Sequence, residues 1–149
     1  MKVVIQNVLN ASVSIDNKIV GSISRGFCLF VGFTLDDNET IVDKMVTKLL
    51  SLRLFNDDNG KTNLSLKEVN GEILSISQFT LYGSVKEGRR PAFLEAMRPE
   101  QATILYDYFN SKLRQSEFKI ETGLFGADMK VSLTNDGPFT IILESKELF

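Results

Sequence analysis

The sequence predicts a single α+β domain in which strands dominate and helices lie on one side. Short apolar runs, several of them alternating with polar residues, recur along most of the chain, and such runs are typical of strands. Two longer segments instead place apolar residues at helical spacing. The chain has 149 residues, of which 43% are hydrophobic and 24% charged. This composition suits one globular domain spanning residues 1–149 with a substantial core.

The first part of the chain predicts strands. Residues 3–9 and 26–33 are apolar runs, and the second is continuous enough for a central strand covered on both faces. Between them, residues 11–15 and 18–23 predict a hairpin around the polar pair Asp16-Asn17. We expect four side chains of this hairpin to face the core: Val13, Ile15, Ile19 and Ile23.

A helix is predicted next. Asp36 and Glu39 resemble a capping box, and residues 40–52 then carry one apolar stripe. The stripe consists of Ile41, Met45, Leu49 and Leu52. The loop that follows, residues 56–60, is rich in turn-forming residues. Because Gly60 stands in the wrong register for a calcium loop, we interpret the segment as a turn.

The second half predicts more strands and two helices. Residues 73–81 form an expected strand, 86–90 a basic loop and 91–97 a short helix. Pro99 opens a longer helix to about residue 115, since proline suits the first helical turn. The apolar stripe of this helix is Ala102, Leu105, Phe109 and Leu113. The remaining expected strands are 118–121, 129–135 and 139–144.

The composition excludes several kinds of chemistry. The chain has no histidine and one cysteine, Cys28. A Ser-His-Asp triad, a histidine zinc site and a thiolate cluster are therefore impossible, and we expect no metal and no cofactor. The net charge of −2 argues against coating DNA or RNA along the backbone, but not against gripping the tip of an RNA.

The location expected from the sequence is the cytoplasm. The amino-terminal segment is too short and too soon polar for a signal peptide. No apolar stretch approaches the roughly 20 residues that cross a bilayer. A single cysteine also suits a reducing compartment.

Three segments are unusual for a plain core, although each has an ordinary explanation. The polar strand end Ser77-Gln78-Phe79-Thr80 needs hydrogen-bond partners unless it simply runs into solvent. Alternation would place Ser77 and Phe79 on one face of that strand. The glycines of residues 122–129 indicate a close backbone approach or an ordinary turn. The segment Asn135-Asp136-Gly137-Pro138-Phe139-Thr140 puts proline between two strands, which also fits a tight loop.

Taken together, these motifs resemble the D-aminoacyl-tRNA deacylase family over essentially the whole chain. The segments that carry the resemblance, in order, are Ser77-Gln78-Phe79-Thr80, Gly88-Arg89-Arg90-Pro91-Ala92-Phe93, Thr122-Gly123-x-Phe125-Gly126-Ala127-x-Met129 and Asn135-Asp136-Gly137-Pro138-x-Thr140. Two positions differ from the family. Asn7 replaces a basic residue that helps to hold the Gly-Pro loop, and Ala92 replaces a serine.

The resemblance implies a barrel-like fold with mostly antiparallel sheets and a homodimer with its active site at the interface. The expected substrate is the 3′ end of a D-aminoacyl-tRNA or glycyl-tRNA, whose ester is hydrolysed. A cis Gly137-Pro138 peptide would reach into the partner's pocket and reject L-amino acids by a clash with its carbonyl groups. A ribose hydroxyl would help to orient or deprotonate water, so that RNA assists the catalysis.

The resemblance also assigns roles to individual residues. We expect the backbone amides of Phe79 and Thr80 to form an oxyanion hole, and Ser77 and Gln78 to position the ester and the adenosine. Four residues are expected to contact the substrate, the first two near the adenine: Phe125, Met129, Asn135 and Thr140. The hydroxyl of Thr80 is a second candidate nucleophile, although it lacks an adjoining base.

Two further questions stay open in the sequence. The basic cluster Lys86, Arg89 and Arg90 either grips tRNA phosphates or is a solvated loop. The whole chain is alternatively a non-catalytic module that binds tRNA ends, a hydrolase of small esters, or a structural dimer. Turnover of a charged tRNA separates the first alternative from an enzyme.

Overall fold

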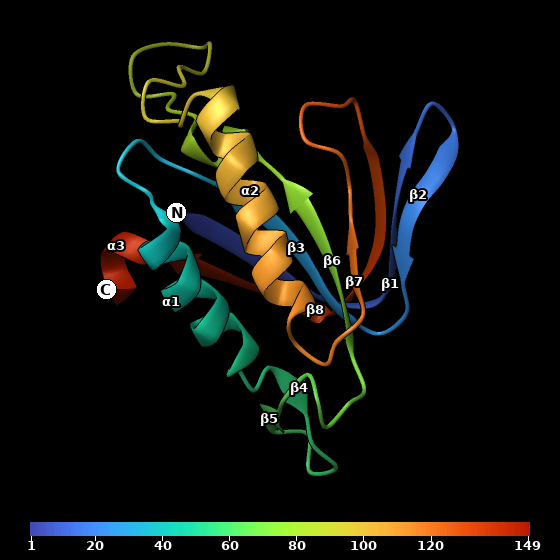
Figure 1. Ribbon diagram of the computed structural model, residues 1–149. Helices are drawn as coiled ribbons and strands as arrows, with labels where there is room; N and C mark the ends of the chain where they lie inside the picture. The colour runs from blue at the N-terminus through green and yellow to red at the C-terminus, as the bar shows by residue number, and fades with distance from the viewer.

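The structure is a computed structural model that describes residues 1–149. Strands and helices alternate along the chain (Figure 1). The elements are β1 (Lys2–Ile15), β2 (Lys18–Ile23), β3 (Gly26–Gly32), α1 (Glu39–Leu50), β4 (Phe55–Asn56), β5 (Thr62–Leu64), β6 (Glu72–Ser77), the 3₁₀ helix η1 (Phe79–Tyr82), α2 (Pro99–Arg114), β7 (Ile120–Thr122), β8 (Lys130–Glu144) and α3 (Ser145–Leu148).

The long strand β1 organises the main sheet. It pairs antiparallel with β2 and β3 and with β8, whereas β3–β6 and β6–β7 are parallel pairs. The sheet curls until β2 approaches β7: a Cβ atom added to Gly21 would lie 3.1 Å from the Thr122 carbonyl oxygen. The predicted strand-rich, barrel-like α+β fold is therefore confirmed.

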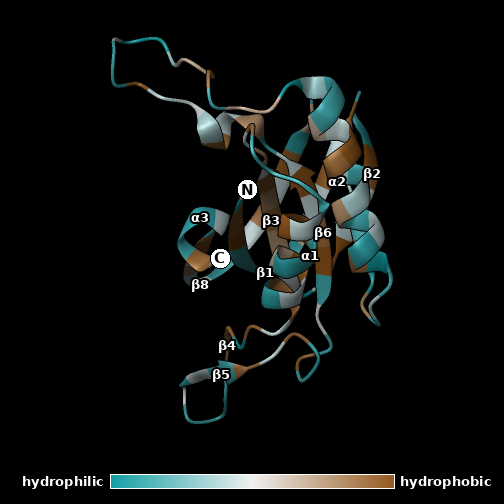
Figure 2. Ribbon diagram, turned by 60° about the vertical axis from the view of Figure 1, so that its left-hand side comes forward, coloured by the Kyte–Doolittle hydropathy of each residue, from teal (hydrophilic) through white to brown (hydrophobic).

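Two helices cover one face of this sheet. Figure 1 shows α1 and α2 in front of the main sheet, and the two helices contact each other. Figure 2 shows the same arrangement from another side, with hydrophobic residues concentrated in the strands between the helices and β8. The predicted stripe of α2 is buried at all four positions, Ala102, Leu105, Phe109 and Leu113, against a core that includes Phe27, Leu29 and Met45.

The hairpin and the first helix differ in detail from the sequence prediction. The turn at Asp16 and Asn17 forms as predicted, with φ values of 49° and 63°. Ile19, however, is 69% exposed, because the tip of the hairpin extends beyond the core. The predicted cap at Asp36 is also wrong: Asn38 caps α1 by accepting a hydrogen bond from the Ile41 amide.

Three predictions in the second half were wrong in their boundaries or type. The strand expected at 73–81 ends at Ser77 and turns into η1. Residues 91–97 form no helix but run alongside other segments, with isolated pairings of Ser84 to Ala92 and Thr34 to Ala96. The two last strands are one long element, β8, whose register against β1 shifts around the Gly-Pro segment.

Candidate active site

The polar motif at residues 77–80 lies where β6 leaves the sheet. The Gln78 amide still donates to the Val31 carbonyl at 2.7 Å, but the chain then bends into η1. A Cβ atom at Gly32 would lie 2.8 Å from the Gln78 carbonyl oxygen, so the bend needs a glycine on the neighbouring strand. The strand alternation predicted for these residues therefore stops at Ser77.

The bend turns backbone donors away from the sheet. The first hydrogen bonds of η1 are donated by Leu81 to the Gln78 carbonyl and by Gly83 to the Thr80 carbonyl. The amides of Phe79 and Thr80 precede these donors and have no acceptor within the helix, as is usual for a first turn. The Thr80 hydroxyl accepts a hydrogen bond from Gln78 Nε2 at 2.6 Å. This corner thus presents two amides and a side-chain network held in place by Gln78.

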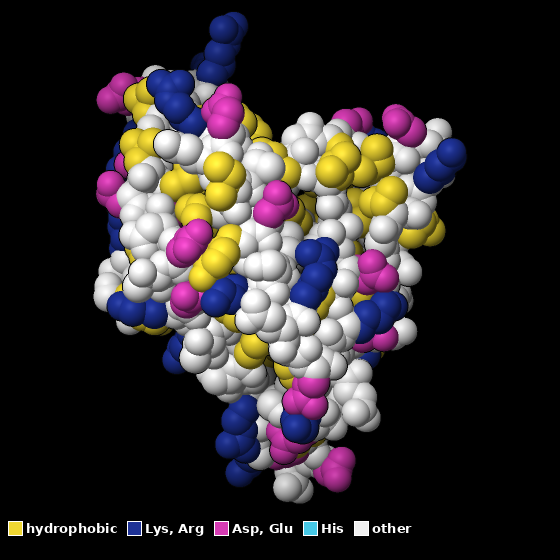
Figure 3. Space-filling model, in the orientation of Figure 1, with side chains coloured by type: hydrophobic (Ala, Val, Ile, Leu, Met, Phe, Trp, Pro, Cys, Tyr) yellow, Lys and Arg dark blue, Asp and Glu magenta, His cyan; other side chains and the backbone are white.

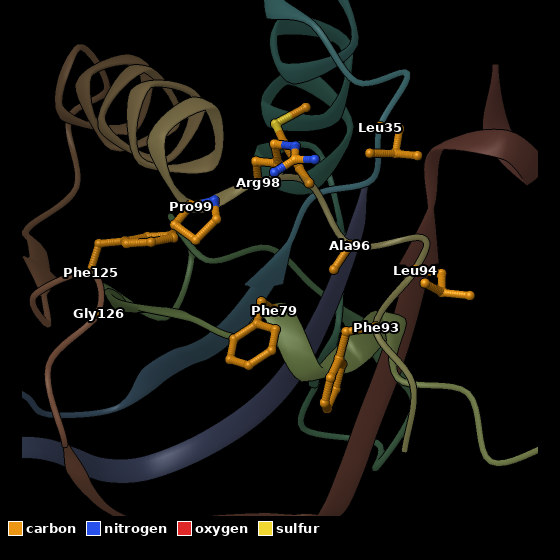
Figure 4. A pocket seen from close by; sticks show the side chains of 10 residues that line it. Leu35, Phe79, Phe93, Leu94, Ala96, Arg98, Pro99, Phe125 and Gly126 are labelled. Carbon is orange, nitrogen blue, oxygen red and sulfur yellow. The ribbon is translucent and has the colours of Figure 1, made fainter. Parts of the chain in front are cut away.

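An apolar cavity of about 590 Å³ adjoins this corner (Figure 4). The Phe79 side chain is 51% exposed and its ring packs against Phe93 with centroids 4.9 Å apart. Phe125 forms another wall and rests on Tyr106, with ring centroids 6.0 Å apart. The remaining lining residues are Leu35, Leu94, Ala96, Met97, Arg98, Pro99 and Gly126. The cavity offers aromatic faces on which a flat base could stack.

The glycine-rich loop between β7 and β8 supplies one wall of the cavity. The Gly123 amide donates to the Ser75 carbonyl at 3.1 Å, which ties the loop to β6. A Cβ atom at Gly123 would lie 2.4 Å from Met129 Sδ, so Met129 packs directly over this glycine. Of the two residues expected near the adenine, Phe125 lines the cavity, whereas Met129 packs beside it against Ile76 and is not a lining residue.

The Gly-Pro segment bulges out of β8. Gln6 pairs with Thr140 and Val8 pairs with Asn135, so four residues of β8 stand opposite the single residue Asn7. The Gly137–Pro138 peptide bond is cis, and the φ of Gly137 is +141°, a conformation that favours glycine.

Neighbouring polar side chains close the bulge. Asn135 Oδ1 accepts a hydrogen bond from the Phe139 amide at 2.6 Å. The Thr140 hydroxyl accepts from Gln6 Nε2 at 3.1 Å and from Asn135 Nδ2 at 3.3 Å. Asn135 and Thr140, which were expected to contact substrate, therefore support the loop from within the chain.

Asn7 takes no part in holding this loop. Its side chain is buried and donates to the Leu54 carbonyl at 2.6 Å on the other side of β1. Gln6 supplies the contact from β1 instead. No residue of 135–140 lines the cavity of its own chain. The predicted site residues thus form two separate groups in one subunit: the cavity corner and the Gly-Pro loop.

The basic cluster lies on the long loop between η1 and α2. Lys86, Arg89 and Arg90 are all exposed, and the pairing of Ser84 with Ala92 closes the loop beneath them. Figure 3 shows basic side chains projecting from the upper end of the molecule, near exposed hydrophobic side chains. Because Phe93 and Leu94 follow this loop directly, the cluster stands next to the cavity wall.

Burial causes the largest pKa shifts among the ionisable groups. It raises the pKa of the Cys28 thiol to about 12 and also raises the pKa of the Tyr106 hydroxyl, which donates to the Ser75 carbonyl at 2.7 Å. Neither group is among the cavity-lining residues. No three His, Cys, Asp or Glu side chains gather where they could hold a metal ion. None of the helices is both long and apolar enough to cross a membrane.

Sequence reasoning missed several parts of the cavity. Phe93 was assigned to a helix, and Leu35 and Arg98 were not singled out. These residues come from three segments that meet only in the folded chain: the β3–α1 connection, the loop after η1 and the start of α2. Phe93 belongs to the family motif that begins at Gly88, so the sequence did contain a pattern that points to it. No local pattern pointed to Leu35 or Arg98.

The fold and this site define a family that comparison with known proteins identifies. Residues 4–144 match the model of the D-Tyr-tRNA(Tyr) deacylase family. The chain belongs to this family. It is 57% identical to the D-aminoacyl-tRNA deacylase of Lactobacillus gasseri over 144 residues, covering 97% of this chain and 99% of the relative. It is 49% identical to the protein of the same name from Bacillus velezensis over 147 residues, covering 99% of this chain and 100% of the relative.

Solved structures share the fold. The c-Myc DNA Unwinding Element Binding Protein superposes with a TM-score of 0.89 at 42% identity, covering 97% of this chain and 98% of that one. A probable eukaryotic D-amino acid tRNA deacylase superposes with a TM-score of 0.81 at 22% identity, covering 95% and 97%. The second likeness supports the fold alone.

Proposed function

We propose that this protein is a D-aminoacyl-tRNA deacylase, an esterase that releases a D-amino acid or glycine from the 3′ end of a tRNA. The observation that carries the proposal is the family match over residues 4–144, because it includes both the cavity corner and the Gly-Pro loop. The protein would act on soluble charged tRNA in the cytoplasm, without a cofactor.

The proposed reaction is attack of water on the ester carbonyl carbon. The carbonyl oxygen becomes an oxyanion, which the amides of Phe79 and Thr80 stabilise. The bond between the carbonyl carbon and the ribose oxygen then breaks, that oxygen takes a proton, and free amino acid and tRNA leave. The neighbouring ribose hydroxyl orients or deprotonates the water. This role would explain how a chain without histidine performs ester hydrolysis.

The cavity would bind the terminal adenosine. Phe79 and Phe125 line the cavity and offer aromatic rings to the base, and base–aromatic stacking contributes about 1–3 kcal/mol. Ser77 and Gln78 hold the corner beside it, since Gln78 fixes the Thr80 side chain. Met129 would act by packing against Gly123 of the glycine-rich loop that carries Phe125.

Chirality would be selected by a second copy of the chain. The Gly137-Pro138 bulge does not line its own cavity, so a homodimer is the arrangement that would bring it to the substrate. Carbonyl groups of the bulge would face the amino acid, where an L side chain clashes and a D side chain points outward. Glycine has no side chain to clash and would be accepted. Asn135 and Thr140 would keep the bulge rigid.

The basic cluster would contact tRNA phosphates near the 3′ end. Lys86, Arg89 and Arg90 are exposed beside the cavity, while the net charge of the chain is −2. Neutralising all three should therefore raise the KM for charged tRNA and weaken its salt dependence. An unchanged KM and an unchanged dependence of KM on salt would show that the cluster is a solvated loop without phosphate contacts.

Turnover of D-tyrosyl-tRNA by the purified protein tests the proposal. Multiple turnovers support the esterase, whereas stoichiometric binding without hydrolysis would indicate the non-catalytic module. Thr80→Ala then separates two roles of the hydroxyl. We expect a rate near that of the wild type, because the amide is retained. Loss of activity from a folded variant would instead support Thr80 as the nucleophile.

A further inference from the structure

The cavity contains a single charged side chain, that of Arg98. The other nine lining residues are apolar or glycine. Arg98 directly precedes Pro99 at the start of α2, and Figure 4 shows it across the cavity from the Phe79 and Phe93 rings. The aromatic walls and this guanidinium thus face the same space.

The Arg98 guanidinium has no partner within the chain. It forms none of the salt bridges and none of the side-chain hydrogen bonds of the structure. Two other arginines have partners: Arg53 donates to Asn63, and Arg25 stacks over the Phe55 ring at 5.2 Å. Arg89 and Arg90 are also unpaired, but only Arg98 lines the cavity. The Arg98 side chain is exposed at the cavity, so its guanidinium is free to form charge-assisted hydrogen bonds with an oxyanion bound there.

The proposed function, on which this inference rests, limits which anion could be bound. The terminal adenine and ribose are neutral, and the aminoacyl group carries an ammonium that a guanidinium repels. The nearest anion of the substrate is the phosphate that joins the terminal nucleotide to the rest of the tRNA. We infer that Arg98 binds this phosphate and so positions the terminal adenosine in the cavity.

This contact would also orient the substrate. With the phosphate at Arg98 and the base on the aromatic walls, the ester is directed away from the positive charge. Phe79, the first residue of η1, lies on that opposite side of the cavity. Arg98 is therefore a substrate-binding residue whose removal weakens binding rather than the chemical step.

The carboxylate of the released amino acid is a second possible oxyanion for the same guanidinium. The two sources predict different inhibition. If Arg98 binds the phosphate, adenosine monophosphate inhibits better than adenosine, and Arg98→Gln abolishes this difference. If it binds the carboxylate, Arg98→Gln instead weakens inhibition by free D-tyrosine and leaves inhibition by adenosine monophosphate and by adenosine unchanged, which would overturn the inference.

The decisive experiment measures KM and kcat for D-tyrosyl-tRNA in the wild type, Arg98→Gln, Arg98→Lys and the control Arg25→Gln. We expect Arg98→Gln to raise KM about tenfold with kcat nearly unchanged, the effect of one exposed charged hydrogen-bond pair. Arg98→Lys should recover part of this loss because it keeps the charge. Arg25 lies at the opposite end of β3 from the cavity, so its variant should behave as the wild type.

Three outcomes are distinguishable. No turnover by the wild type contradicts the proposed function. Turnover by the wild type with the same KM in Arg98→Gln contradicts the role of Arg98 alone. A fall in kcat without a change in KM also contradicts it, since a binding contact with the phosphate should not act only on the chemical step. Equal thermal unfolding of all four proteins establishes that the variants are folded.

Discussion

A buried ion pair ties the amino terminus to the wall of the cavity. The Met1 ammonium lies 2.6 Å from Asp37 Oδ1 and 2.7 Å from the Ser145 hydroxyl, and its partner Asp37 is also buried. Asp37 Oδ2 accepts the Thr34 amide at 2.7 Å. The Thr34 hydroxyl in turn donates to the Glu95 carbonyl at 2.7 Å, next to the lining residue Ala96. We therefore predict that Asp37→Asn destabilises the whole fold.

The size of the effect follows from the burial. Asparagine keeps the shape of the side chain but leaves the ammonium without its counter-ion. Breaking a buried pair in this way costs about 3–5 kcal/mol. For a domain of this length, each 1 kcal/mol corresponds to about 2–4 °C. The predicted fall in Tm at neutral pH is therefore about 10 °C.

The loss should also depend on pH. Burial lowers the pKa of the Met1 ammonium from its ordinary value of 8.0, although Asp37 raises it. A group with a depressed pKa in the folded state stabilises the fold above its unfolded pKa and loses that contribution as pH falls. Removing Asp37 deepens the depression. The difference between wild type and variant should therefore be largest near pH 6 and shrink above pH 8.

Thermal and urea unfolding followed by circular dichroism measure this difference. The matched control is Lys67→Gln, which removes an exposed pair between Lys67 and Glu117 and should cost less than about 1 kcal/mol. A loss below about 1 kcal/mol for Asp37→Asn, or one that is equal at both pH values, would refute the reasoning.

Three further predictions concern the loop, the thiol and the core. Asn135→Ala removes the hydrogen bond from the Phe139 amide, so the ratio of the D-ester to the L-ester hydrolysis rate should fall about tenfold. An unchanged ratio would show that this hydrogen bond does not hold the Gly-Pro loop in its selective conformation. Because burial raises the pKa of Cys28 to about 12, the native thiol should resist iodoacetamide at pH 8. The contribution of this thiol to the free energy of unfolding should be constant below pH 9 and decrease towards pH 12. Phe109→Ala should cost about 3–5 kcal/mol in urea unfolding, whereas the exposed Ile104→Ala should cost under about 1 kcal/mol; similar losses would contradict the assignment of the core.

Local sequence patterns predicted the elements in which the apolar residues of the segment itself determine which face is buried. The helix beginning at Pro99 has its stripe on one face, and the continuous apolar run at residues 26–33 became the central strand β3. The patterns failed where tertiary contacts decide. η1 replaces a strand because the chain bends over Gly32, which is distant in sequence. The residues before Met97 stay extended because Ala92 and Ala96 pair with other segments.

The site was predictable in its motifs but not in its assembly. The order of the motifs predicted Phe79 and Phe125, which line the cavity, whereas the role of the Gly-Pro loop in the site stays a prediction. The support of that loop by Gln6 arises from a register shift between β1 and β8, which no spacing in the sequence reveals. Arg98 gave no signal because an isolated arginine before a helix is ordinary. Its significance comes from the apolar walls that three other segments bring around it.

The central claim is that the protein hydrolyses D-aminoacyl esters of tRNA and spares L-aminoacyl esters. The most direct test is hydrolysis of D-tyrosyl-tRNA and L-tyrosyl-tRNA side by side with the purified protein. We predict rapid loss of the D ester while the L ester persists as it does without protein. Equal loss of both esters would contradict the Gly137-Pro138 filter, and persistence of both with a folded protein would contradict the esterase itself.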